Sequence, residues 1–169
     1  MNKRFLDYYM DIADRTALLS RAVRLKVGAV LVKDGRIISQ SWNGTPAGQD
    51  NNCEYREWMP KGCLHLNDEY PYEEYSDYGY SVIGRYRLKT KPEVIHAEAN
   101  LIMKLASISE SGKGATIFIT ASPCIDCAKL IYGTGISEVF YKDNYRDDSG
   151  IDFLKSVGIT VNHYQPEAI

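Results

Sequence analysis

The sequence contains no long hydrophobic run, and its first residues lack the apolar stretch of a secretory signal peptide. No segment approaches the ~18 apolar residues that a membrane-spanning helix needs. A basic excess is also missing, because 20 Lys and Arg residues stand against 22 Asp and Glu residues. A general nucleic-acid-binding protein would present a basic face. These absences predict a protein that binds neither membranes nor nucleic acid, although a local cluster of cations could still hold a small anion.

Cysteine is scarce, with four residues in a chain of 169, and two of the four stand in a Cys-x-x-Cys motif at Cys124 and Cys127. A motif that needs thiolates indicates a reducing compartment, so we expect a cytoplasmic protein. Hydrophobic residues make up 44% and charged residues 25% of the chain, as in soluble globular proteins. No internal repeat or interdomain linker is visible. The sequence therefore predicts a single domain over residues 1–169.

Hydrophobic periodicity predicts an alternation of helices and strands. A helix is expected over residues 4–20, followed by a β-hairpin whose strands, 27–32 and 37–42, flank an Asp-Gly turn. The remaining elements are expected to alternate as helix 96–107, strand 115–120, helix 124–133, strand 139–141, helix 150–157 and strand 159–163. This order predicts an α/β fold whose sheet is mostly parallel in its second half, with helices on its faces.

Between these parts, residues 49–92 show no regular period and are expected to form a long irregular insertion. Residues 67–80 within it are rich in tyrosine and acidic side chains. Long loops of this kind serve as lids or interfaces, or are mobile. Tyrosine is enriched at interfaces, so a subunit contact and a mobile surface loop both remain open.

Two short motifs carry the chemistry: His96-Ala97-Glu98 and Pro123-Cys124-Ile125-Asp126-Cys127. Imidazole and thiolate are ligands that zinc prefers, and a catalytic zinc keeps three protein ligands and one open position. Cysteines three residues apart on a helix face the same side. His96, Cys124 and Cys127 are therefore predicted to hold one Zn²⁺, with Glu98 beside the ion but not bound to it. This pair of motifs is the signature of zinc-dependent nucleobase deaminases.

Two other interpretations of these motifs remain open. The Cys-x-x-Cys motif could be a redox pair, although His96 and Glu98 would then have no purpose. It could also belong to a structural zinc site with four protein ligands, if Cys53 or Cys63 joined it. Cys53, Cys63 and His65 could alternatively form part of a second metal site.

The chain resembles the deoxycytidylate (dCMP) deaminases. The resemblance rests on five stretches that span nearly the whole chain in family order: Lys26–Val30, Asn43–Gly48, His96–Asn100, Ser122–Lys129 and Tyr145–Arg146. The two zinc motifs are shared with other deaminases. The Asn-Gly-x-Pro-x-Gly loop and the late Tyr-Arg pair narrow the resemblance to the dCMP deaminases. The resemblance implies a cytidine deaminase-like three-layer α/β/α fold with a five-stranded mixed sheet, in strand order 2-1-3-4-5.

The resemblance also implies the reaction, a hydrolytic conversion of dCMP to dUMP and ammonia that supplies dUMP for thymidylate synthesis. Zinc lowers the pKa of a bound water from ~16 towards ~7, which makes hydroxide available at neutral pH. Glu98 is expected to move protons from this water to the base and to the departing amine. The resemblance places Asn43 on the deoxyribose hydroxyl, although Asn43 could instead be a turn residue. It places the Ala97 amide and a carbonyl near Ser122 on the pyrimidine edge.

For the 5′-phosphate we expect Arg24, Tyr145 and Arg146, with Lys26 as a weaker candidate, because arginine holds phosphate in a bidentate fork. Each of these cations could instead be a solvated surface charge. Discrimination in favour of a monophosphate should vanish if the arginines are lost, while the zinc chemistry remains.

Many family members are homohexamers activated by dCTP and inhibited by dTTP with Mg²⁺. The resemblance therefore implies a homo-oligomer and a regulatory nucleotide site, for which Gly48, Asn51 and Asn52 are the candidate residues. Rival functions are deamination of another base or nucleoside, such as tRNA adenosine or cytidine, and a non-catalytic zinc module. The absence of a basic excess argues against the tRNA substrate, and Glu98 beside an open zinc position argues against the module.

Overall fold

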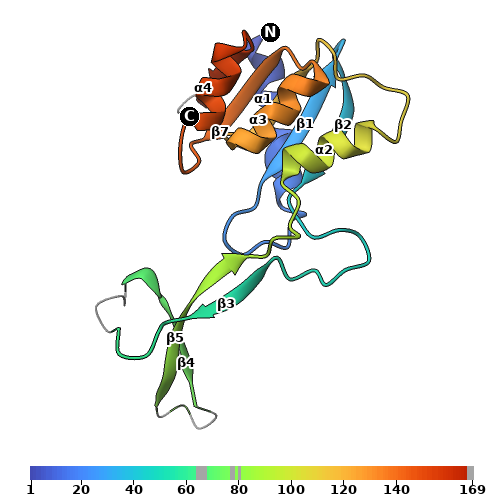
Figure 1. Cartoon of the computed structure of the whole chain (residues 1–169). Coiled ribbons are helices and arrows are strands. Elements are labelled where there is room, and N and C mark those ends of the chain that lie inside the picture. Colours follow the sequence, from blue (N-terminus) through green and yellow to red (C-terminus); the bar gives the residue numbers. More distant parts are fainter. Residues whose placement is uncertain (64–67, 77–78, 80, 167–169) are drawn as a thin grey trace.

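A computed structural model describes residues 1–63, 68–76, 79 and 81–166. Its main body is a five-stranded sheet in the order β2-β1-β6-β7-β8, with helices on both faces (Figure 1). The elements of this body are α1 (Lys3–Ala17), β1 (Gly28–Lys33), β2 (Arg36–Trp42), α2 (Ala97–Leu105), β6 (Thr116–Ala121), α3 (Ile125–Thr134), β7 (Glu138–Asp143), α4 (Ser149–Ser156) and β8 (Thr160–His163). The predicted α/β class, the five-stranded mixed sheet and its strand order are confirmed.

The sheet is mixed because its two halves are connected differently. β1 and β2 form an antiparallel hairpin, and β1 also pairs antiparallel with β6. At the hairpin turn Asp34 and Gly35 have φ angles of 50° and 72°, as a type I′ turn requires. β6, β7 and β8 pair in parallel through helical crossovers.

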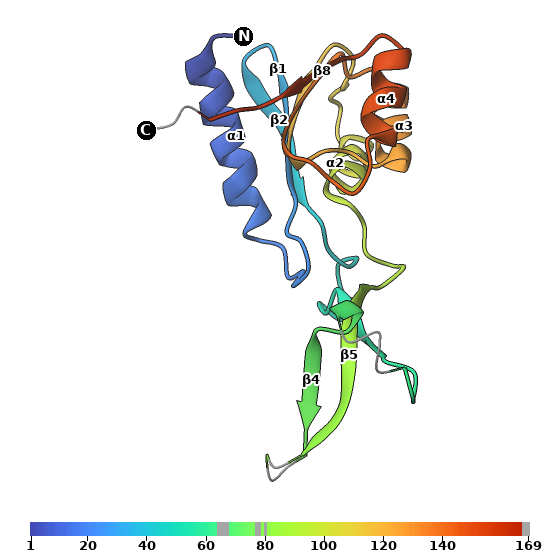
Figure 2. The same cartoon turned by 90° about the vertical axis from the view of Figure 1, so that its left-hand side faces the viewer.

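The buried strand β1 serves both faces of the sheet. Ala29 and Leu31 pack into the core shared with α2, α3 and α4, whereas Val30 and Val32 pack against α1. In Figure 2, α1 lies on one side of the sheet and these three helices lie on the other. This is the expected three-layer arrangement. None of the described helices is long and apolar enough to cross a membrane.

The expectation of an irregular insertion over residues 49–92 is wrong. This segment contains a second, antiparallel sheet of three strands in the order β3-β5-β4, made of β3 (Glu54–Trp58), β4 (Tyr72–Tyr75) and β5 (Val82–Thr90). The sheet projects away from the main body as an arm (Figure 1). Ion pairs link its strands: Arg56 with Glu74, Arg85 with Glu73, and both Arg87 and Lys89 with Glu57.

The arm is joined to the body by paired backbone rather than by a loose linker. Gly44 and Ile95 form an isolated antiparallel bridge, and the amide of Lys91 donates to the carbonyl oxygen of Cys53 at 2.9 Å. The chain thus leaves the body directly after Asn43 and returns directly before His96. Of the tyrosine- and acid-rich segment 67–80, residues 67, 77, 78 and 80 lie outside the described residues, and its predicted subunit contact stays a prediction.

Candidate active site

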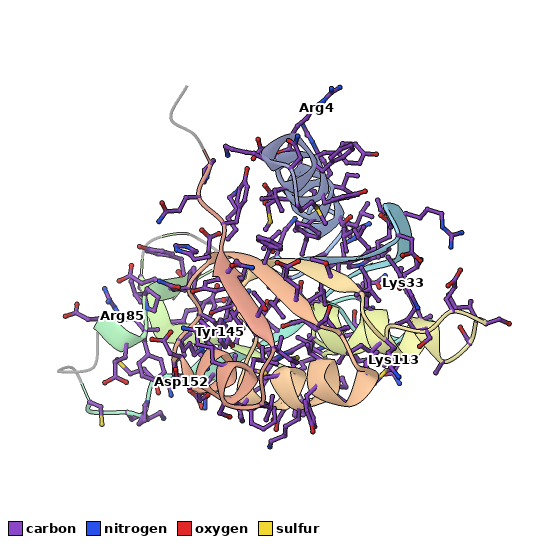
Figure 3. The ribbon with its side chains drawn as sticks, turned by 90° about the horizontal axis from the view of Figure 1, so that it is seen from above. Arg4, Lys33, Arg85, Lys113, Tyr145 and Asp152 are labelled. Carbon is purple, nitrogen blue, oxygen red and sulfur yellow. The ribbon has the colours of Figure 1, made fainter. Side chains whose placement is uncertain are left out.

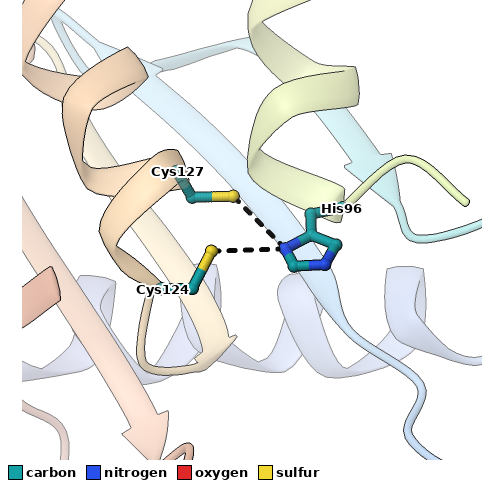
Figure 4. Close-up of side chains that lie close together, drawn as sticks. All are labelled: His96, Cys124 and Cys127. Carbon is teal, nitrogen blue, oxygen red and sulfur yellow. Dashed lines mark hydrogen bonds between the residues drawn. The ribbon is translucent and has the colours of Figure 1, made fainter. Parts of the chain in front are cut away.

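The three predicted zinc ligands come from the N-terminal ends of two helices on the same face of the sheet. His96 is the N-cap of α2, Cys124 is the N-cap of α3, and Cys127 lies in the first turn of α3. Figure 4 shows both sulfur atoms facing the imidazole ring of His96. Both helices therefore start one residue later than the sequence predicted, because His96 and Cys124 are caps. The partial positive charge of a helix N-terminus favours thiolates at this place.

The separations between the three side chains fit a tetrahedral zinc site. The Sγ atoms of Cys124 and Cys127 both lie 3.5 Å from Nδ1 of His96. Zinc–sulfur and zinc–nitrogen bonds of about 2.3 and 2.05 Å at a tetrahedral angle put the two ligand atoms about 3.6 Å apart. All three ligand atoms lie within 4.8 Å of one another, and no other such cluster occurs among residues 1–63, 68–76, 79 and 81–166. His96 would therefore bind through Nδ1.

The electrostatics of the cluster favour a thiolate. Hydrogen bonds from Cys127 and from His96 lower the pKa of Cys124 to about 4. The hydrogen bond to Cys124, together with burial, raises the pKa of the Cys127 thiol. The same contact with Cys124 raises the pKa of His96. These shifts favour a thiolate at Cys124, with the protons on Cys127 and His96. A divalent cation would displace those protons, because it binds the deprotonated forms of all three side chains.

Glu98 lies in the first turn of α2, two residues after His96, and is 4% exposed. Burial raises the pKa of its carboxyl group to about 7. A carboxyl group with a pKa close to the working pH can both accept and donate a proton within one reaction cycle. It shares a cavity with His96 and Cys124.

That cavity has a volume of about 460 Å³, enough for a small ligand. It lies at the edge of the sheet where β6 and β7 end, as is usual in α/β folds. In Figure 3, Tyr145 lies on this side of the body, away from Lys33 and Lys113. The cavity is lined by six of the predicted substrate-binding residues, Arg24, Asn43, Ala97, Ser122, Tyr145 and Arg146, but not by the weaker candidate Lys26.

The Tyr145–Arg146 pair is held over this edge by the buried Ser122. The Ser122 Oγ accepts a hydrogen bond of 2.7 Å from the amide of Tyr145, and the Ser122 amide donates to the carbonyl oxygen of Asp143. The Arg146 guanidinium lies 5.4 Å from the centre of the Tyr145 ring. Arg146 is thus placed by its contact with the Tyr145 ring. The Tyr145 backbone is in turn held by Ser122, which directly follows β6.

Asn43 is not a tight-turn residue, because Gly44 continues into the bridge with Ile95. Its side chain instead orders the loop after α1. Oδ1 accepts from the amide of Val27 at 2.8 Å, and Nδ2 donates to the carbonyl oxygen of Leu25 at 2.9 Å. Both polar atoms of the side chain are therefore engaged, while a second lone pair of Oδ1 and one hydrogen of Nδ2 stay available for a ligand.

Other predicted residues lie apart from the cavity. Gly48, Asn51 and Asn52 lie in the exposed segment before β3, where the Asn52 amide donates to Asp50. Lys26 lines a different, neighbouring cavity. For the suggested second metal site, Cys53 is buried and Cys63 is half-buried, and His65 lies outside the described residues.

Several residues that line the cavity were not predicted from the sequence. Glu54 and Thr90 come from the arm, and Val94 and Asn144 come from loops. The arm residues were not predicted because their segment was expected to be irregular. The alternation of charged and uncharged side chains over residues 85–90 was the sequence signal that could have revealed strand β5.

Gly150 should be intolerant of any side chain, because α4 packs directly on the backbone of the zinc loop. A Cβ atom there would lie 2.0 Å from the carbonyl oxygen of Pro123 and 2.9 Å from the carbonyl carbon and oxygen of Cys124. We expect Gly150→Ala to lower the free energy of unfolding by about 2–3 kcal/mol and to weaken zinc binding. Denaturant titration and zinc-competition assays measure both.

The matched control is Gly133→Ala, in α3, where an added Cβ meets no atom within 4 Å. This change should stabilise the protein by about 0.5–1 kcal/mol, because Gly is costly within a helix. Equal zinc affinity in the two variants would contradict the close packing of α4 on the Cys124 loop.

The comparisons with known proteins agree with this geometry. Residues 3–143 match the family model of the cytidine and deoxycytidylate deaminase zinc-binding region. The deoxycytidylate deaminase of Enterobacteria phage T4 is 34% identical over 90% of this chain and 86% of its own length. That of Saccharomyces cerevisiae is 32% identical over 93% of this chain, which spans 44% of the yeast protein. A crystal structure of the dCMP deaminase of cyanophage S-TIM5, in complex with dCMP and dUMP, superposes with a TM-score of 0.76 at 34% identity, covering 97% of this chain and 99% of that one. The chain therefore belongs to the deoxycytidylate deaminase family.

Proposed function

We propose that this protein catalyses the hydrolytic removal of the 4-amino group of dCMP, which gives dUMP and ammonia. The observation that carries this proposal is the composition of one cavity. His96 and Cys124 of the zinc cluster and the buried carboxyl group of Glu98 share it with two arginines, Arg24 and Arg146. The zinc cluster and Glu98 suit hydrolysis of a base, and the arginines suit a phosphate.

The chemistry at the base would be carried by Glu98. A zinc ion held by His96, Cys124 and Cys127 would supply the activation that lets water attack at neutral pH. Glu98 would take a proton from the attacking water and deliver it to ring N3. It would then take the proton of the new C4 hydroxyl group and give it to the amine, so that the C4–N bond breaks, ammonia leaves and the C4 carbonyl forms. Its burial supports this role, because a carboxyl group with a pKa near 7 exchanges protons in both directions.

The base would be oriented by backbone groups at the start of α2 and the end of β6. Ala97 is the first residue of α2, and the first amides of a helix have no acceptor within the helix. We assign this amide and the carbonyl of Ser122 to the pyrimidine edge. The remaining N–H of Asn43 would donate to the deoxyribose hydroxyl.

The phosphate would be held by Arg24 and Arg146, with Tyr145 placing Arg146. Both arginines line the cavity, and the two reach it from different segments of the chain. A guanidinium fork on each side matches the several oxygen atoms of a 5′-phosphate. The phosphate would then distinguish dCMP from deoxycytidine.

The test is ammonia release and loss of cytosine absorbance by the zinc-loaded protein with dCMP, CMP, deoxycytidine and dCTP. We expect turnover confined to dCMP. Arg146→Ala should raise KM for dCMP by about 10–100-fold, because charge-assisted bonds to phosphate are lost. The exposed Arg36, which pairs with Glu110, provides the control variant Arg36→Ala, which should behave like wild type. If the zinc-loaded protein leaves dCMP unchanged, the proposed function is refuted, and other bases become the candidate substrates.

We also propose that the protein is a homo-oligomer, a hexamer by family resemblance, regulated by dCTP and by dTTP with Mg²⁺. Gly48, Asn51 and Asn52 are exposed, outside the catalytic cavity, in the segment that connects Asn43 to the arm, which is a suitable place for an effector. Adding each nucleotide with Mg²⁺ to the dCMP assay tests this regulation, and light scattering tests the assembly. Unchanged kinetics with both nucleotides would refute the proposed regulation.

A further inference from the structure

The base of the arm contacts the loop that carries Arg24. Glu54, the first residue of β3, lies opposite Thr90, the last residue of β5, in the register of the second sheet. The Glu54 carboxylate accepts hydrogen bonds from the backbone amides of Val23 and Arg24, at 3.0 and 3.1 Å. The Arg24 guanidinium in turn donates to the Thr90 hydroxyl at 3.1 Å. One cross-strand pair therefore holds both the backbone and the side chain of this arginine.

These contacts matter because they fix Val23 and Arg24 themselves. Asn43 fixes the same loop further along, at Leu25 and Val27. Val23 is 70% exposed, and Arg24 is also exposed. An exposed arginine on a loop has many rotamers, and ordering one costs up to about 2 kcal/mol of side-chain entropy. A carboxylate that accepts two amide bonds is a strong anchor for the backbone. Arg24, Glu54 and Thr90 all line the cavity that contains His96 and Cys124.

The Glu54–Thr90 pair is itself fixed relative to the zinc cluster. Next to this pair, the Lys91 amide donates to the Cys53 carbonyl oxygen, and nearer the body Gly44 and Ile95 form an isolated bridge. Ile95 directly precedes His96. Two separate sites of main-chain pairing thus connect the residues that hold Arg24 to the segment that carries a zinc ligand.

We propose that Glu54 and Thr90 are positioning residues that hold Arg24 for the 5′-phosphate of the substrate, so that the base of the arm forms part of the phosphate site. This inference rests on the proposed function. The bond to Thr90 uses one of the five N–H groups of the guanidinium and leaves the others for phosphate oxygens. The negative charge of Glu54 is directed at the amides of Val23 and Arg24, which reduces its repulsion of the substrate phosphate.

The test separates positioning from general stability through KM and kcat for dCMP. Glu54→Ala should raise KM by about tenfold and change kcat by less than about twofold, since the loss of bonds to a charged group costs this much. Glu54→Gln retains an oxygen that accepts both amide bonds, so its KM should stay within about threefold of wild type. Thr90→Val, which removes only the hydroxyl, should raise KM by about threefold.

The matched control is Glu57→Ala. Glu57 lies on the same strand and forms ion pairs with Arg87 and Lys89 within the arm, outside the cavity. Glu57→Ala should weaken the arm without changing KM for dCMP. In an Arg24→Ala background, Glu54→Ala should have no further effect on KM, because the residue it positions is absent.

Several results would overturn the inference. These are a fall in kcat at unchanged KM, an equal effect of Glu57→Ala, and effects of Glu54→Ala and Arg24→Ala that multiply. If Glu54→Ala does not fold, the comparison of Thr90→Val with wild type and the Thr90→Val, Arg24→Ala double variant decide the question. Wild-type protein that fails to deaminate dCMP would refute the proposed function itself, whereas active wild type with an unaffected Glu54→Ala variant would refute this inference alone.

Discussion

Replacing Glu98 by Gln should lower kcat for dCMP by about 10³–10⁴-fold while leaving the zinc content of the protein unchanged. The amide keeps the size and position of the side chain but cannot carry protons from water to the base. Glu98 is not one of the three clustered ligand residues, so metal binding should not depend on it. Steady-state kinetics together with metal analysis of the same preparation make the measurement.

The control for this variant is Glu93→Gln, which changes an exposed glutamate five residues earlier in the chain. It should have wild-type kinetics. Glu98→Gln should also unfold at the same or a higher denaturant concentration, because a buried carboxyl group is replaced by a neutral amide. Near-normal turnover by Glu98→Gln would contradict its proton-transfer role.

The main sheet could be predicted from the sequence because its elements are specified locally. The Asp34-Gly35 turn sets the hairpin, and short apolar runs such as those of β1 and β6, rich in β-branched residues, are typical of buried strands. Helices between later strands force parallel pairing, which follows from the chain order alone. Element ends were less well specified, since the capping geometry of Cys124 and His96 depends on tertiary contacts.

The arm could not be predicted in this way, because its stability comes from pairing across the sequence. Glu57 meets Arg87 and Lys89, and Arg56 meets Glu74, over separations that a local pattern does not register. Its strands are half-exposed and rich in charge, so they lack the apolar runs that marked β1 and β6. Charge complementarity between strands was the information that the local pattern left out.

The residues of the candidate site also fall into two groups, those that could be predicted from the sequence and those that could not. The pairing of Cys124 with Cys127 follows from their spacing within one helical turn. The addition of His96 and Glu98, which belong to another helix, rested on the two motifs occurring together in the deaminase signature. Glu54 and Thr90 reach the cavity only through the register of the arm, and the bonding of Asn43 to Val27 and Leu25 depends on the path of the preceding loop. The chemistry was therefore readable from the sequence, whereas the support of the phosphate site required the structure.

Replacing Cys127 by Ala should remove zinc and lower turnover of dCMP on the order of 10³-fold or more. Cys127 is 2% exposed, and its Sγ lies 3.5 Å from Nδ1 of His96, so no nearby solvent ligand replaces it at equal geometry. Removing zinc from wild type with a chelator should have the same effect, reversed by added Zn²⁺. The melting temperature should fall in both cases, because a metal that binds only the folded state stabilises it.

Cys63→Ser is the control that separates this site from a second one. Cys63 is half-buried and does not belong to the His96 cluster, so this variant should retain zinc, activity and melting temperature. A loss of metal in Cys63→Ser with activity preserved would instead place a structural ion at Cys63. Retention of zinc in Cys127→Ala would refute the three-ligand site, because the two remaining ligands, both at helix N-caps, bind zinc far more weakly than three. The catalytic proposal therefore depends on the metal content of these two variants, measured before any kinetics.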